Sequence, residues 1–125
     1  MKSLKKLFIL LIVLGISISS FAGLKSKNVV GEWKTLIVIS DSQMTGSFIF
    51  YEKSGELKGE YIPSEGTKST TSKIKINKKN NTLTFEIPRE TDIPIEFILI
   101  VEENKLRGKG WINDANFEIT GEKIN

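Results

Sequence analysis

Two segments of this chain, about fifty positions apart, repeat the same order of residue types. Residues 48–59 and residues 97–108 each begin with four apolar residues, pass through a polar turn and end with Leu, a basic residue and Gly. Apolar runs joined by a short polar turn predict a β-hairpin. We therefore expect two equivalent hairpins in a chain made of two pseudo-repeated four-stranded halves. Such a doubling constrains the architecture more than any single strand does.

The remainder of the chain beyond residue 28 also has the character of strands. It is rich in Ile, Thr, Phe and Val, it is punctuated by Gly and Asn, and it shows no sustained helical period. Because the turns are short, neighbouring strands should be antiparallel. Closing the sheet would remove its two unpaired edges. The sequence therefore predicts an all-β fold, an eight-stranded antiparallel up-and-down barrel, with strands at residues 31–39, 46–52, 56–62, 72–77, 82–87, 95–102, 105–112 and 116–122.

Two segments are expected to lie outside these strands. Residues 63–71 form the longest connection and are rich in Ser, Thr and Gly, which favours a mobile flap. Residues 23–28 are short and polar, and we expect a flexible lead-in to the first strand.

Residues 1–22 have the organisation of a secretory signal peptide. Three lysines precede an apolar stretch, and Ser20 and Ala22 place small residues at the cleavage positions before Gly23. The apolar stretch is shorter than the roughly 20 residues that a membrane-spanning helix needs. We therefore expect a signal peptide at 1–22, a barrel domain at 23–125, export to the periplasm or the medium, and no stable membrane anchor after cleavage.

Charge and reactive residue types argue against several functions. Three of the 18 basic residues and none of the 15 acidic ones lie within residues 1–22, so the mature chain carries 15 of each. This neutrality argues against nucleic acid as a partner. The chain has no His and no Cys, so the usual catalytic base, thiol nucleophile and zinc ligands are missing. We expect a protein that is not an enzyme, with no metal, no cofactor and no disulfide.

Alternation of side chains along the strands predicts which residues face the barrel interior. The expected interior sets are Trp33, Thr35, Ile37 and Ile39 in the first strand, Leu83, Phe85 and Ile87 in the fifth, and Phe117, Ile119, Gly121 and Lys123 in the last. In the second and sixth strands both faces are apolar. Their inward faces stay open between the set of Phe48, Phe50, Phe97, Leu99 and Val101 and the set of Ile49, Tyr51, Ile98 and Ile100.

The start of the first strand carries a known motif. Gly31-Glu32-Trp33 resembles the Gly-x-Trp signature that opens the first strand of lipocalins, fatty-acid-binding proteins and avidin-like barrels, together called calycins. The resemblance implies a lipocalin-like barrel in which Trp33 closes one end and a basic side chain near the end of the last strand packs across it. Lys123 is the residue in that place.

The first functional hypothesis is that the barrel binds a small apolar ligand. An eight-stranded barrel either fills its interior with its own side chains or holds one small ligand. The aromatic residues that would suit a flat apolar guest are Trp33, Phe50, Tyr61, Phe85 and Phe97. An interior cavity of roughly 300 Å³ or more would favour this hypothesis, whereas a filled interior would favour recognition on the outer surface.

The alternative hypothesis is a protein-interaction or structural module of the cell envelope with no ligand cavity. If Trp33 points inward, then Leu36 and Val38 point outward, next to a strand whose Ile49 and Tyr51 also point outward. Contiguous apolar surface of this kind commonly marks a partner site. The partner would be a second copy of the chain or another envelope protein.

Overall fold

The structure, a computed structural model, describes residues 23–90 and 93–124. The expected signal peptide at residues 1–22 lies outside the described residues. Those that are described form nine strands and one short helix, with bounds α2 Ser26–Val29, β1 Gly31–Ile39, β2 Ser42–Lys53, β3 Glu56–Pro63, β4 Ser69–Thr70, β5 Ser72–Asn77, β6 Thr82–Ile87, β7 Ile95–Glu102, β8 Lys105–Ile112 and β9 Ala115–Lys123. With four residues, α2 is far too short to cross a bilayer, and no other described helix could do so.

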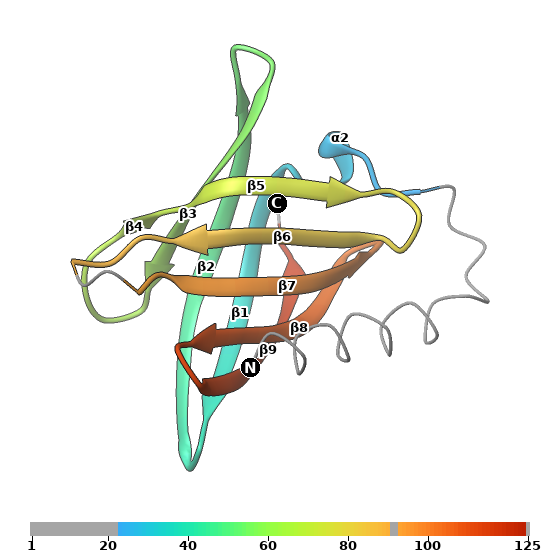
Figure 1. The fold of residues 1–125 in the computed structure, drawn as a ribbon. Coiled ribbons are helices and arrows are strands. Elements are labelled where there is room, and N and C mark those ends of the chain that lie inside the picture. The colour runs from blue at the N-terminus through green and yellow to red at the C-terminus, as the bar shows by residue number, and fades with distance from the viewer. Residues whose placement is uncertain (1–22, 91–92, 125) are drawn as a thin grey trace.

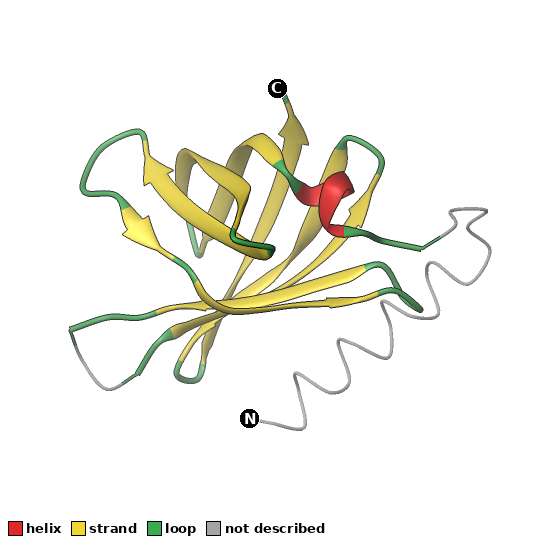
Figure 2. Cartoon of the chain, turned by 90° about the horizontal axis from the view of Figure 1, so that it is seen from above, coloured by secondary structure: helices red, strands yellow, loops and turns green. Residues whose placement is uncertain are grey.

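All nine strands belong to one antiparallel sheet with the order β4-β3-β2-β1-β9-β8-β7-β6-β5. The strands curve around a common interior (Figure 1), and the view from above shows them enclosing it (Figure 2). Apart from the β1–β9 pair, neighbours in the sheet are consecutive along the chain, which is the up-and-down topology that the short turns predict. The result is a nearly closed up-and-down barrel.

The barrel is closed by pairing of the first long strand with the last. β1 and β9 run antiparallel from the pair Trp33–Lys123 to the pair Val38–Glu118. This pairing confirms the expected closure. At the other junction β4 continues almost directly into β5, and Thr71 between them donates its backbone N–H to the Gly59 carbonyl of β3 at 2.9 Å. The continuous segment of β4 and β5 therefore pairs first with β3 and then with β6.

The strand count and two segment predictions need correction. The expected flap at residues 63–71 contains a ninth strand, β4, which pairs with Glu60 and Tyr61 of β3. The expected flexible lead-in contains α2, and its neighbour Leu24 is completely buried. Both segments are mainly polar, so hydrophobic periodicity could not predict their structure. Backbone pairing with β3 holds the first segment, and the buried side chain of Leu24 anchors the second.

The second strand also begins four residues earlier than expected. Ser42–Lys53 includes an exposed polar stretch, Ser42 to Thr45, that pairs residue by residue with β1. Its apolar residue, Met44, is 43% exposed and stands among polar neighbours, so alternation could not detect the stretch. Continued backbone pairing with β1 extends β2 beyond the core.

Both hairpins of the repeated pattern are present, as β2–β3 and β7–β8. In each, an inward-facing core residue lies opposite a glycine: Phe50 opposite Gly59, and Leu99 opposite Gly108. The first turn residues, Ser54 and Glu103, both have φ near +54°. The duplication itself stays a prediction.

The core occupies the barrel interior and confirms the expected faces of the first, fifth and last strands. Trp33, Leu83 and Ile119 are at most 1% exposed. In β2 and β7 the open question is settled in favour of Phe48, Phe50, Phe97, Leu99 and Val101, which belong to the core cluster. On the opposite face Ile98 and Ile100 are also buried, together with Trp111 of β8, but these three lie outside the core cluster.

Candidate functional site

The interior of the barrel is filled by aromatic rings. The ring centroids of neighbouring residues lie 4.8 to 5.7 Å apart, the spacing of stacked and edge-to-face packing. Phe48 is at the centre of this cluster, because its ring contacts four of the other five members. The cluster consists of Phe48, Phe50, Tyr61, Phe85, Phe97 and Phe117. Four pockets lined by described residues, which measure 240 to 620 Å³, lie on the outer surface or the rim.

One polar atom in the interior lacks a partner. The Tyr61 hydroxyl is buried and makes no hydrogen bond with a described residue. Burial raises the pKa of Tyr61, and the neighbouring Thr35 hydroxyl partly offsets the rise. Thr35 itself donates to the Gly46 carbonyl at 3.2 Å.

Trp33 and Lys123, the pair that the sequence motif implied, lie opposite each other where β1 begins and β9 ends. The Trp33 indole Nε1 donates to the Val29 carbonyl at 2.8 Å, which ties α2 to the first strand. The Lys123 ammonium lies 5.5 Å from the centroid of the Trp33 ring and also donates to the Asn28 carbonyl at 3.3 Å. A cation over an indole ring is worth about 0.5 to 1 kcal/mol at an exposed site.

The junction between β3 and β5, which we call the seam, is open over part of its length. β3 pairs with β4 only at Glu60 and Tyr61, and Thr71 adds its bond to Gly59. Before Gly59, residues 56–58 of β3 have ladder partners only in β2, and β5 has ladder partners only in β6. The β2–β3 hairpin rises away from β5 above this point (Figure 1).

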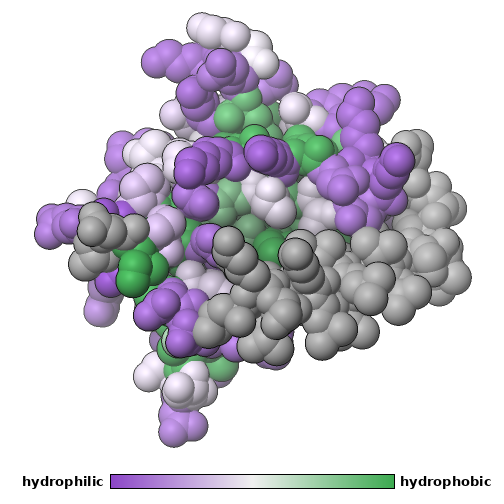
Figure 3. Space-filling model, in the orientation of Figure 1, coloured by the Kyte–Doolittle hydropathy of each residue, from purple (hydrophilic) through white to green (hydrophobic). Residues whose placement is uncertain are grey.

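A pocket of about 300 Å³ fills the gap at the seam. Its walls are residues 56–58 of β3 and residues 72–74 of β5, with Thr71 between them. The side chains of Leu57, Ile74 and Ile76 are half-buried at this junction and pack against the core. The space-filling view shows apolar surface among polar side chains between the raised hairpin and β5 (Figure 3).

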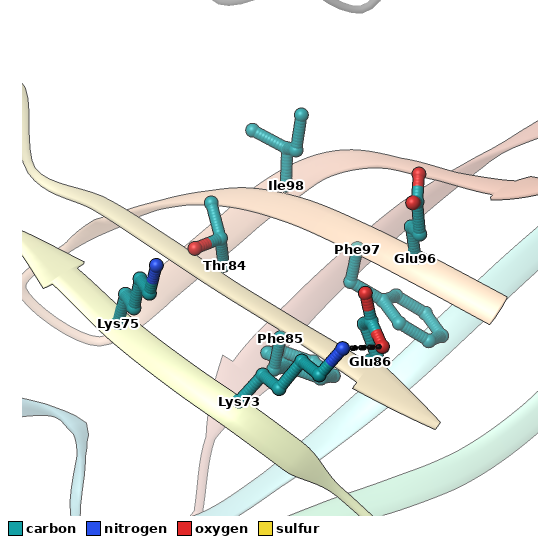
Figure 4. A pocket seen from close by; sticks show the side chains of 8 residues that line it. All are labelled: Lys73, Lys75, Thr84, Phe85, Glu86, Glu96, Phe97 and Ile98. Atoms are coloured by element: carbon teal, nitrogen blue, oxygen red, sulfur yellow. Dashed lines mark ion pairs between the residues drawn. The ribbon is translucent and has the colours of Figure 1, made fainter. Parts of the chain in front are cut away.

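A second, shallower pocket of about 240 Å³ lies on the outer face of β5, β6 and β7. Lys73, Lys75, Thr84, Glu86, Glu96 and Ile98 surround it, and Lys73 forms an ion pair with Glu86 at 3.6 Å (Figure 4). The rings of Phe85 and Phe97 belong to the core on the other side of the sheet. The pocket is a charged depression on the outer wall.

The structure separates the residues of the expected interface. Leu36 and Val38 are half-buried opposite Thr45 and Gln43, whereas Ile49 is half-buried opposite Glu32. Tyr51 follows Ile49 by two residues, lies beyond the part of β2 that pairs with β1, and is opposite Lys58 of β3. The four side chains therefore form two small groups at different heights of the barrel.

The ligand-binding candidates do converge. Phe50, Tyr61, Phe85 and Phe97 all belong to the ring cluster, and Trp33 lies in the same core. The sequence did not predict the seam, because the position of the seam depends on which strands diverge in space. The one available signal was the run of five lysines without an acid between residues 68 and 79, which marks the strand at the open edge.

No protein-family model matches the chain, and no curated protein matches it. Several solved structures share its fold, among them the following two. A redesigned β-barrel aligns with a TM-score of 0.58 and 16% identity, over 80% of this chain and 95% of the other. Fatty-acid-binding protein 1 of Echinococcus granulosus aligns with a TM-score of 0.55 and 13% identity, over 79% and 99%. The fold is thus a calycin-type, lipocalin-like barrel, as the Gly-x-Trp motif implied.

Among residues 23–90 and 93–124, no group of three or more Asp or Glu side chains is placed to hold a metal ion.

Proposed function

We propose that this chain is an exported, non-catalytic binding protein that recognises another polypeptide on the outside of its barrel. The observation that carries this proposal is the filled interior. Six aromatic rings in mutual contact occupy the space where related barrels could hold a guest. Pockets are present at the seam, on the outer wall and at the rim.

The residue types support a role without catalysis. The chain carries no His or Cys to act as a base or a thiol nucleophile. The Tyr61 hydroxyl is enclosed by the core, and its raised pKa disfavours the phenolate that would be needed for chemistry. Export is supported by the signal-peptide pattern of residues 1–22.

Titration with a fluorescent fatty acid, cis-parinaric acid, tests whether the interior is closed. We expect no saturable one-to-one binding to the wild-type protein at micromolar concentration. A Phe48→Ala variant serves as the positive control, because removing the central ring opens a cavity of the kind that binds apolar molecules. Its folded state is checked by its NMR spectrum. Tight one-to-one binding by the wild type would contradict the proposal.

A small apolar ligand is the second candidate function. Two observations favour it: the fold likeness to a fatty-acid-binding protein, and the buried Tyr61 hydroxyl that has no described partner. A ligand with one hydrogen-bonding group could satisfy this hydroxyl after displacing a ring. If the wild type binds the probe and a Tyr61→Phe variant binds it several-fold more weakly, this second candidate replaces the first.

A further inference from the structure

The seam presents unpaired backbone on both of its sides. Gly59 directs its carbonyl toward the β4 side, where Thr71 donates to it. Because main-chain groups alternate along a strand, the N–H and C=O of Leu57 point the same way. No described strand pairs with Leu57 on that side. Across the gap, β5 has a bulge between Ser72 and Lys75, where Lys73 has a φ of 54°, and beyond it alternate residues of 75–77 direct their main-chain groups away from β6.

The opening is a wedge between the free edges of β3 and β5, and at some positions the Cα atoms of the two strands lie within 8 Å of each other. Its apex is the Thr71–Gly59 contact, from which residues 56–58 diverge on one side and residues 74–77 on the other. A pocket of about 300 Å³ occupies the gap. At about 3.3 Å per residue, facing edges of this length accommodate roughly four residues of extended chain. The half-buried side chains of Leu57 and Ile74 would cover the inward side chains of such a segment.

The charge beside the opening indicates what kind of segment fits. The β4–β5 region contains Lys68, Lys73, Lys75, Lys78 and Lys79 and no acidic residue. Lys75 is exposed on the outer face, and on the other side of the gap the Lys58 side chain, 45% exposed, forms an ion pair with Glu56 at 3.0 Å. Opposite charges on neighbouring strands attract, whereas a second copy of β5 would bring lysines against lysines.

We propose that the seam binds an extended acidic peptide segment of a partner protein as an additional strand between β3 and β5. Main-chain hydrogen bonds to Leu57 and to β5 provide the affinity, apolar side chains of the peptide face Leu57 and Ile74, and its acidic side chains face Lys58 and Lys75. This inference rests on the proposed function, since it names the partner chemistry and the place of recognition. It also explains why lysines lie on and beside β5, one of the two strands whose edges are open at the seam.

The test uses a capped seven-residue peptide of alternating Glu and Val, titrated into the mature protein and followed by NMR. We expect amide shifts confined to residues 56–58 and 71–77, with slower hydrogen exchange at Leu57. A peptide with N-methylated amides at alternate positions should not bind, because its donors are blocked. Binding of the two peptides with equal affinity would overturn the proposal.

Two charge reversals provide matched variants. Lys75→Glu, beside the opening, should weaken binding of the peptide roughly five-fold or more by replacing attraction with repulsion. Lys79→Glu, in the turn after β5, makes the same change in net charge and should alter affinity less than two-fold. Equal effects of the two variants would show only long-range attraction and would overturn the strand arrangement.

Further outcomes separate the seam from the broader proposal. If neither the peptide nor cis-parinaric acid binds, the seam proposal is overturned and recognition on another outer surface remains. If cis-parinaric acid binds in the interior, the proposed function is overturned, whatever the peptide does. If the protein dimerises with the Leu57 amide protected and excludes the peptide, a second copy occupies the edge and the acidic partner is overturned.

Discussion

Tyr61 shows at the scale of one residue how this core balances packing against hydrogen bonding. Its ring stands 4.8 Å from that of Phe48, but its hydroxyl is enclosed without a described partner. A buried unsatisfied polar group costs about 1 to 3 kcal/mol. An added Cβ at Gly46 would lie 2.5 Å from the Tyr61 oxygen, so glycine is required there to leave room for the hydroxyl.

Replacing Tyr61 with Phe should therefore leave the free energy of unfolding unchanged or raise it by about 1 kcal/mol at pH 7. Because burial raises the pKa of Tyr61 above its ordinary value of 10.0, the folded state holds this proton more tightly than the unfolded state. The wild type should lose stability as the pH rises above about 10, and Tyr61→Phe should lose less. Urea unfolding at pH 7 and pH 10.5 measures both effects. Tyr51→Phe controls for loss of a phenol elsewhere, and a destabilisation above 1 kcal/mol at pH 7 would show that the hydroxyl has a partner.

Gly108 shows a second residue-scale constraint, set by backbone rather than by side chains. An added Cβ would collide with the Ile98 carbonyl oxygen and would lie 2.8 Å from the Leu99 Cα. Backbone in the middle of a barrel cannot move aside cheaply, so Gly108→Ala should lower the free energy of unfolding by about 2 kcal/mol or more. Gly55→Ala offers a contrast, since that site is open and costs only about 1 kcal/mol for its positive φ of 79°. Similar losses in thermal unfolding for the two variants would contradict the packing argument.

At the scale of an element, α2 is held by tertiary contacts rather than by its own helical propensity. A helix of one turn is unstable alone. Leu24 and Val29 are fully buried, and the Trp33 indole and the Lys123 ammonium each bond to a carbonyl of residues 28–29. The segment therefore keeps its position only while those contacts persist.

Loosening this segment should expose it to protease. Trp33→Phe removes the donor to the Val29 carbonyl and should cost about 1 to 3 kcal/mol, because that carbonyl stays buried. We expect trypsin to cleave after Lys25 or Lys27 several-fold faster than in the wild type, as followed by mass spectrometry. Lys123→Met should give a smaller acceleration. Lys105→Met, which removes an exposed lysine of β8, is the matched control, and equal cleavage rates in all variants would mean that α2 is anchored by Leu24 and Val29 alone.

The elements differ in how well the sequence could predict them. Core strands such as β6 and β7 have the expected bounds, because buried apolar residues mark their whole length. β4 and the first residues of β2 are defined by backbone pairing of mainly polar, exposed residues, which leaves no periodic signal. The seam could not be predicted for the same reason, because it is defined by which backbone groups lack a partner. The interior aromatic residues were predicted as a set, but whether they enclose a cavity depends on ring contacts that alternation cannot supply.

At the scale of the whole molecule, closure depends on contacts between the two ends of the described chain. Ile37 of β1 lies opposite Ile119 of β9, and Trp33 lies opposite Lys123. All other long pairings join strands that are consecutive in the chain. Because distant segments must meet at a cost in chain entropy, we expect the β1–β9 pairing to form after the hairpins during folding.

The order of assembly can be read from folding and unfolding rates. Ile119→Val deletes a methylene at the closing pair and should cost about 0.5 to 1.5 kcal/mol. If β9 docks after the transition state, this loss appears almost entirely as faster unfolding, by about two- to ten-fold. Val101→Ala, in the β7–β8 hairpin opposite Leu106, should instead slow folding. Stopped-flow measurements of tryptophan fluorescence in urea give both rates. Slower folding in Ile119→Val, with no slowing in Val101→Ala, would mean that closure nucleates the barrel and that the hairpins form around it.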